Sequence, residues 1–180
     1  HLREPNCIQS YAALAAIAIQ SNQNDQHGGQ SIPNFDYGMA EGIAKTYRKA
    51  FKRRLKEVVE DFFDLEDEMD TITEAIQEAE TVSGENARLE NTDAFNSAMH
   101  KALTSRYNLT ERQAAKLVTK AQKRAWQKTD RDTHQSMEGF VHNLNTMHSR
   151  AGAQTPFSSI NYGMDTSPEG RMVMKNVLLA

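Results

Sequence analysis

Apolar side chains recur every three or four residues from Met39 to Ile76. This spacing places them along one side of an α-helix, so it predicts one long helix or two nearly collinear helices. Charge along the same stretch is polarised, because a basic run from Lys45 to Lys56 precedes a run of acidic residues. A solvated helix face is one explanation of this pattern. The alternative is that the basic half faces a polyphosphate, which clustered lysines and arginines neutralise.

Further elements are predicted on both sides of this stretch. The alanine-rich segment after Pro5 is apolar on nearly all sides, which favours a helix packed closely against others, whereas polar residues 22–30 predict a loop. Asn34 or Asp36 is expected to cap the next helix. Later helices are expected to begin near Asn91, at the capping box of residues 110–113, at Asp130 or Asp132, and at Ser167-Pro168-Glu169. Residues 157–162 form the only convincing strand.

The chain changes character abruptly after Asn145, from helix to flexible loop to strand, and such junctions often hold ligands in α/β proteins. Arg150 offers a fixed charge and a fork of donors, Gly152 allows a close backbone approach, and Gln154 adds neutral hydrogen bonds. The loop could therefore contact a ligand. Alternatively, Arg150 caps the preceding helix and Gln154 belongs to an ordinary turn.

Three segments together resemble the anaerobic (class III) ribonucleoside-triphosphate reductases, which are glycyl-radical enzymes. They are residues 27–36 (HGGQSIPNFD), 145–163 (NTMHSRAGAQTPFSSINYG) and 166–172 (TSPEGRM). The similarity extends in order from about Glu4 to the last residue. It implies an α/β fold, mainly helical in this fragment, that is part of a ten-stranded α/β barrel. Residues 1–180 would be a single partial domain, with residues 1–148 mainly helical and residues 149–180 forming a loop, a barrel strand and a helix.

The resemblance also implies an allosteric site. In these reductases a deoxynucleoside triphosphate or ATP, with Mg²⁺, binds at the homodimer interface, and the helices that begin near Pro5 and Phe35 match those that pack across it. The relay loop that reports the identity of the effector matches Ser149, Arg150, Ala151, Gly152, Ala153, Gln154 and Thr155. The expected effector-binding residues are Gln26, His27, Gly28 and Gly29, with Lys45 and Arg48 as phosphate contacts chosen by position and charge. Many relatives carry tyrosine where this chain has His27, so a base-stacking role at that position is in doubt.

No catalytic residue is expected in residues 1–180. The family needs a thiyl cysteine and a radical glycine, and by resemblance both lie downstream of the matched segments. The one cysteine, Cys7, is interpreted as a packed thiol. The isolated fragment is therefore expected to be inactive and to hold no cofactor. In the parent enzyme a separate activating enzyme, with an iron–sulfur cluster and S-adenosylmethionine, would install the glycyl radical.

Composition limits the other possibilities. The formal net charge of -3 argues against nucleic acid as the main partner, and the longest apolar run is too short to span a membrane. A cytoplasmic location is expected by default. The six histidines lack the spacing that zinc favours, so no metal site is expected. The alternative function is a free-standing helical interaction module, which would have no need of the loop and strand after Arg150.

Overall fold

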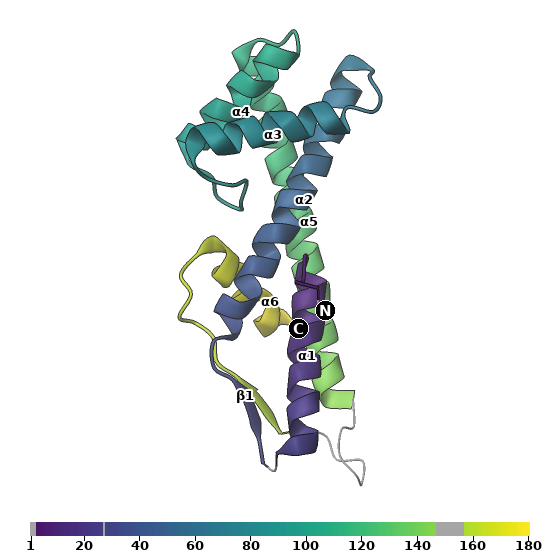
Figure 1. The fold of residues 1–180 in the computed structure, drawn as a ribbon, viewed down its shortest axis with the longest axis vertical. Coiled ribbons are helices and arrows are strands. Elements are labelled where there is room, and N and C mark those ends of the chain that lie inside the picture. The colour runs from purple at the N-terminus through teal and green to yellow at the C-terminus, as the bar shows by residue number, and fades with distance from the viewer. Residues whose placement is uncertain (1–2, 27, 147–156) are drawn as a thin grey trace. The chain divides into compact units, whose positions relative to one another are not determined.

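The computed structural model describes residues 3–26, 28–146 and 157–180, and these ranges are predominantly helical. The elements in chain order are α1 (Ile8–Asp25), β1 (Gln30–Ile32), α2 (Phe35–Phe63), α3 (Met69–Ser83), α4 (Asp93–Arg106), α5 (Glu111–Thr146), β2 (Ser158–Ile160) and α6 (Pro168–Leu179). Figure 1 shows these elements. The chain divides into two compact units, with α2 and α5 each contributing to both. Unit 1 falls within residues 1–46 and 130–180, and unit 2 comprises residues 47–129. This division concerns contacts within the chain, so the prediction of one partial domain of a larger protein stays a prediction.

Helix α1 packs against the first turns of α2 in unit 1. A Cβ atom at Gly42 would lie 2.8 Å from the ring of Tyr11, so only glycine allows this approach. The backbone N–H of Ile8 donates to Thr46 Oγ1 at 2.9 Å, which fixes the start of α1. Burial is confined to one side of α1, whereas Leu14 and Ile17 are 43% and 56% exposed. The predicted packing helix thus packs on one side only within this chain.

The two strands pair in parallel, with Gln30 opposite Ser158 and Ile32 opposite Ile160. Residues 22–30 were predicted to be a loop, but α1 continues to Asp25 and β1 begins at Gln30. The prediction of a single strand was also incomplete, because β1 lies beside it. A strand of three residues has too short an alternation to be recognised without its partner.

Helix α3 folds back instead of continuing α2, in contrast to the predicted collinear arrangement. A straight helix would separate residues 48 and 80 by about 48 Å at 1.5 Å per residue. Arg48 and Glu80 instead form an ion pair at 2.7 Å. The reversal occurs in residues 64–68, where Asp64 and Asp67 have φ of 53° and 61°. These left-handed conformations end the helical hydrogen bonding of α2.

Local capping signals correctly predicted the starts of three helices. Thr92 accepts from the backbone of Phe95 at the start of α4, and Thr110 and Gln113 bond reciprocally before α5. Ser167 accepts from the N–H of Gly170 at the start of α6. The predicted break at Asp130 or Asp132 is wrong, because α5 runs unbroken from Glu111 to Thr146.

The side chain of Asp130 is used between helices rather than as a cap. It accepts hydrogen bonds from Lys175 and Asn176 of α6, both at 2.9 Å. The pKa of Asp130 is lowered, because these bonds outweigh the effect of partial burial, which acts to raise it. No helix in the described ranges combines the length and apolar character needed to cross a bilayer.

Candidate functional site

The structure brings the end of the segment between α1 and β1 next to Phe157, the residue before β2. The N–H of Gln30 donates to the carbonyl of Phe157 at 2.9 Å. A Cβ atom at Gly29 would lie 3.0 Å from the Phe157 ring, and Gly28 has φ of +110°. The Gly-Gly pair thus serves two needs, since Gly28 adopts a conformation that L side chains avoid and Gly29 permits close contact.

Several predicted site residues have defined positions. Gln26 is the C-cap of α1, with its N–H bonded to the carbonyl of Asn22 at 2.9 Å. Predicted residues that lie outside the described ranges are His27, Ser149, Arg150, Ala151, Gly152, Ala153, Gln154 and Thr155. Their roles stay predictions. Phe157, two residues beyond the predicted relay loop, is described and is 82% exposed.

Asp36, in the first turn of α2, is a buried carboxylate that the sequence suggested only as a cap. One of its oxygens accepts from the consecutive N–H groups of Gly163, Met164 and Asp165, at 2.8, 3.0 and 2.9 Å. The other accepts from the N–H of Tyr37 at 3.0 Å. Burial acts to raise the pKa of Asp36, but these four donors outweigh it and the pKa is lowered. Asp36 therefore fixes the connection between β2 and α6 to the start of α2.

Lys45, a predicted phosphate contact, is engaged by groups within unit 1. Its ammonium donates to Glu4 and to the Tyr11 hydroxyl, the latter at 3.1 Å, and pairs with Glu41 at 3.0 Å. The pKa of Lys45 is raised, chiefly by the bond to Glu4 and then by Tyr11 and Glu41. A phosphate at Lys45 would have to replace one of these carboxylates.

Arg48, the other predicted phosphate contact, belongs to unit 2. Its Nε and one terminal nitrogen donate to the two carboxylate oxygens of Glu80, each at 2.7 Å. The pKa of Arg48 is raised, chiefly by these hydrogen bonds. This bidentate geometry is the strongest form of the arginine–carboxylate pair. Arg48 thus also has a structural role, and its predicted role with an effector stays untested.

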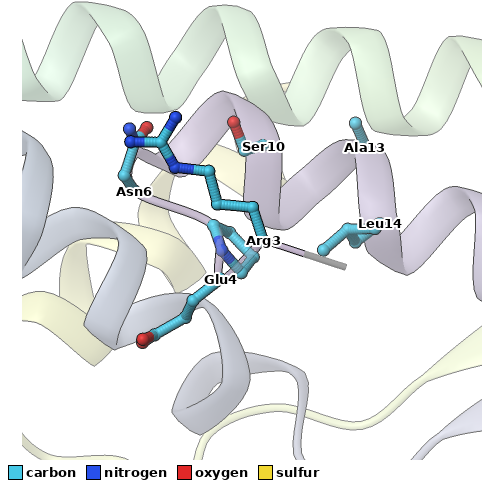
Figure 2. A pocket seen from close by; sticks show the side chains of 7 residues that line it. Arg3, Glu4, Asn6, Ser10, Ala13 and Leu14 are labelled. Atoms are coloured by element: carbon cyan, nitrogen blue, oxygen red, sulfur yellow. The ribbon is translucent and has the colours of Figure 1, made fainter. Parts of the chain in front are cut away.

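An open cavity of about 380 Å³ lies beside the exposed side of α1 (Figure 2). Its lining comprises Arg3, Glu4, Pro5, Asn6, Ser10, Ala13 and Leu14. Arg3 brings a guanidinium to the cavity, while Ala13 and Leu14 form an apolar side (Figure 2). The sequence did not single out this cavity, because its lining residues form no recognisable short motif.

The remaining candidate groups have ordinary surroundings. Cys7 is the N-cap residue of α1, is partly buried, and has its Sγ 3.2 Å from Ser10 Oγ. Within residues 3–26, 28–146 and 157–180, no group of three or more His, Cys, Asp or Glu side chains is arranged to hold a metal ion.

Comparison with known proteins gives one clear result. The family model of the anaerobic ribonucleoside-triphosphate reductases matches residues 1–180, and no curated protein matches the chain. The family match covers the Gly28-Gly29 loop, the paired strands and every described helix. This chain therefore belongs to the anaerobic ribonucleoside-triphosphate reductase family.

Proposed function

We propose that residues 1–180 are the effector-binding and dimer-interface part of an enzyme that reduces ribonucleoside triphosphates to deoxyribonucleoside triphosphates by radical chemistry. The segment binds a deoxynucleoside triphosphate or ATP, with Mg²⁺, and relays its identity to the active site through residues 149–155. Its own role is the selection of substrate, while the thiyl cysteine, the radical glycine and their activating enzyme act elsewhere in the assembly. A cytoplasmic location remains part of this proposal.

The parallel pairing of β1 with β2 is the observation that carries the proposal. It holds Gly29 against Phe157, so a nucleotide that moves Gly28 and Gly29 would also move the residue that leads from the relay loop into β2. Coupling of this kind is typically about 1 to 3 kcal/mol, which is enough to reorder substrate preference. The segment after α1 and the strand that follows the relay loop are thus joined by one hydrogen bond and one ring contact.

The small sheet also supports a place in a larger barrel. Purely parallel sheets are normally covered on both faces, and isolated pairs of strands are marginal in water. Two strands of three residues each are therefore expected to join further strands of the parent protein. The ten-stranded barrel is the arrangement that the family resemblance suggests.

The exposed side of α1 supports the homodimer. Leu14 and Ile17 are exposed one turn apart, and exposed Ala13 and Ala18 adjoin them. Small residues beside two large apolar ones allow two helices to approach closely. The alternative of a free-standing helical module is disfavoured, because the family match includes β2 and α6.

Nucleotide-dependent thermal unfolding tests this function directly. The chain, at a concentration where light scattering shows a dimer, is heated with dATP, dGTP, dTTP, ATP or inorganic triphosphate. A nucleotide at 100 times its dissociation constant should stabilise the chain by about 2.7 kcal/mol. The expected shift depends on the base and is lost in Arg150→Ala and in Lys45→Ala/Arg48→Ala.

Unfolding without nucleotide is the control for the second variant, because Lys45 and Arg48 also bind Glu4 and Glu80. A dimer that shows no shift with any nucleotide would contradict the effector site. Equal shifts with all four nucleotides would contradict the selection of substrate by the base.

A further inference from the structure

A second cavity lies between α2 and α3, entirely within unit 2, and has a volume of about 180 Å³. It is lined by Arg48, Lys49 and Lys52 from α2 and by Thr73, Ile76 and Gln77 from α3. The only fully apolar residue of this lining, Ile76, is 3% exposed, and the other five are polar or charged. Three of the six residues that line this cavity are therefore cationic.

Lys49 and Lys52 differ from the other cations of the basic run on α2. Each of the others has a carboxylate partner; the pairs are Lys45 with Glu4 and Glu41, Arg48 with Glu80, Arg53 and Arg54 with Glu57, and Lys56 with Glu60. In the described part of the chain, no carboxylate pairs with Lys49 or Lys52. Both nevertheless line the same cavity, three residues apart on one helix face.

Like charges at this spacing repel one another, so the helix is less stable unless an anion neutralises them. Glu80 does not serve this purpose, because its carboxylate is held by Arg48 and by the N–H of Ala87 and forms no ion pair with either lysine in the described residues. Besides the two ammonium groups, the side-chain amide of Gln77 in the lining is a neutral hydrogen-bond donor. The hydroxyl of Thr73 donates its proton to the carbonyl of Met69 at 2.6 Å. Thr73 therefore lines the cavity without offering a free donor to an anion.

We propose that this cavity is a binding site for a compact phosphate anion, held by Lys49, Lys52 and Gln77. Ligand pockets for drug-sized molecules are about 300–1,000 Å³, so 180 Å³ is too small for a whole nucleoside. It suits a phosphate or diphosphate group, either free or at the end of a nucleotide. This site is defined within unit 2 and does not rest on the proposed effector function.

Calorimetric titration of the purified chain with inorganic diphosphate tests the site. Lys49→Gln/Lys52→Gln removes both charges, and Lys49→Arg/Lys52→Arg keeps them. Lys56→Gln is the matched control, because it removes one charge from the same helix at a residue paired with Glu60. Unfolding curves of all variants establish that they fold.

Diphosphate should bind the wild-type chain, and the double Gln variant should bind about tenfold more weakly or worse. The double Arg variant and Lys56→Gln should bind nearly as the wild type does. Absence of diphosphate binding to the wild type, or equal binding by a folded double Gln variant, would overturn the proposal.

Competition identifies the source of the anion. Displacement of diphosphate by dATP and dTTP alike would support the terminal phosphates of a nucleotide, whereas failure of both to compete would support a free anion. Loss of diphosphate binding in a variant that keeps its base-dependent thermal shift would separate this site from the effector function.

Discussion

Gly29 lies so close to Phe157 that a Cβ atom at residue 29 would be 3.0 Å from the phenyl ring. The contact joins two residues that are 128 positions apart in the chain. The family resemblance assigns Gly29 to the effector site and places Phe157 in the strand that follows the relay loop. Phe157 also accepts a hydrogen bond, through its carbonyl, from the N–H of Gln30, the residue that follows Gly29. Changes at the two neighbouring glycines should therefore have separable effects.

Gly28→Ala should destabilise the chain more than Gly29→Ala does. At φ of +110°, alanine at residue 28 would be strained whatever the space around it, at about 1–3 kcal/mol. At residue 29 the closest overlap is with the ring of Phe157, a side chain that is 82% exposed and therefore has solvent to move into. Gly29→Ala should thus cost less than about 1 kcal/mol by thermal unfolding.

Gly29→Ala should have its main effect on effector coupling, because the added methyl group displaces Phe157. Its nucleotide-dependent shift should fall, and Gly29→Ala/Phe157→Ala should lose the steric conflict and recover the stability of Phe157→Ala. A Gly29→Ala chain that is as destabilised as Gly28→Ala would contradict the separate roles of the two glycines.

Asp36→Asn should destabilise the chain by about 2 kcal/mol, because a carboxylate that accepts four buried N–H groups is replaced by an amide. The pKa of Asp36 is lower in the folded chain than in the unfolded chain. The folded form therefore binds fewer protons, and its stabilisation is complete above the unfolded pKa of about 3.8. It is lost as the pH falls below that value through the folded pKa.

Denaturant unfolding between pH 7 and pH 2.5 measures this dependence. The free-energy difference between wild type and Asp36→Asn should be constant at neutral pH and should shrink in the acid range. Asp93→Asn is a control, because Asp93 is also an acid in the first turn of a helix, α4. A difference that stays constant down to pH 2.5 would contradict the role of the charged carboxylate.

The separation of two bonded residues along the chain decides whether their contact can be predicted from the sequence. The bonds at Thr110 and Ser167 join residues three positions apart, so short patterns predicted them correctly. Asp36 accepts hydrogen bonds from residues about 127 positions away. An acid near the start of a helix has the same sequence pattern whether it caps that helix or binds a distant segment. Asp130 is the same case, since its partners on α6 are 45 and 46 positions away.

In the candidate site, too, short sequence patterns were recognisable and long-range ion pairs were not. The Gly28-Gly29 turn and the basic run on α2 were visible in the sequence. Which cations of that run are paired was not, because α3 had first to fold back and place Glu80 beside Arg48. Lys49 and Lys52 therefore stood out only once the three-dimensional partners of their neighbours were known.

Leu14→Asp/Ile17→Asp should weaken the proposed dimer by about a hundredfold, because two large apolar side chains contribute about 3 kcal/mol or more on burial. Both are exposed in the isolated chain, so its fold should be little changed. Sedimentation over a range of concentrations measures the dissociation constant. Val82→Asp on α3, where the side chain is 71% exposed, is the control. An unchanged dimer in the double variant would place the interface elsewhere.

Glu4→Gln should strengthen the binding of nucleoside triphosphates if Lys45 contacts the effector. In the structure, Glu4 takes a hydrogen bond from Lys45 and is the chief cause of the raised pKa of that lysine. The Glu4 side chain is 74% exposed, so Glu4→Gln should leave the unfolding temperature nearly unchanged. Removal of the competing carboxylate would leave the ammonium more available to phosphate.

Titration with dATP and dTTP measures the change, and Glu41→Gln releases the second partner for comparison. Weaker binding in Glu4→Gln would show instead that Lys45 serves the effector by holding the segment before α1 in place, and unchanged binding in both variants would remove Lys45 from the site.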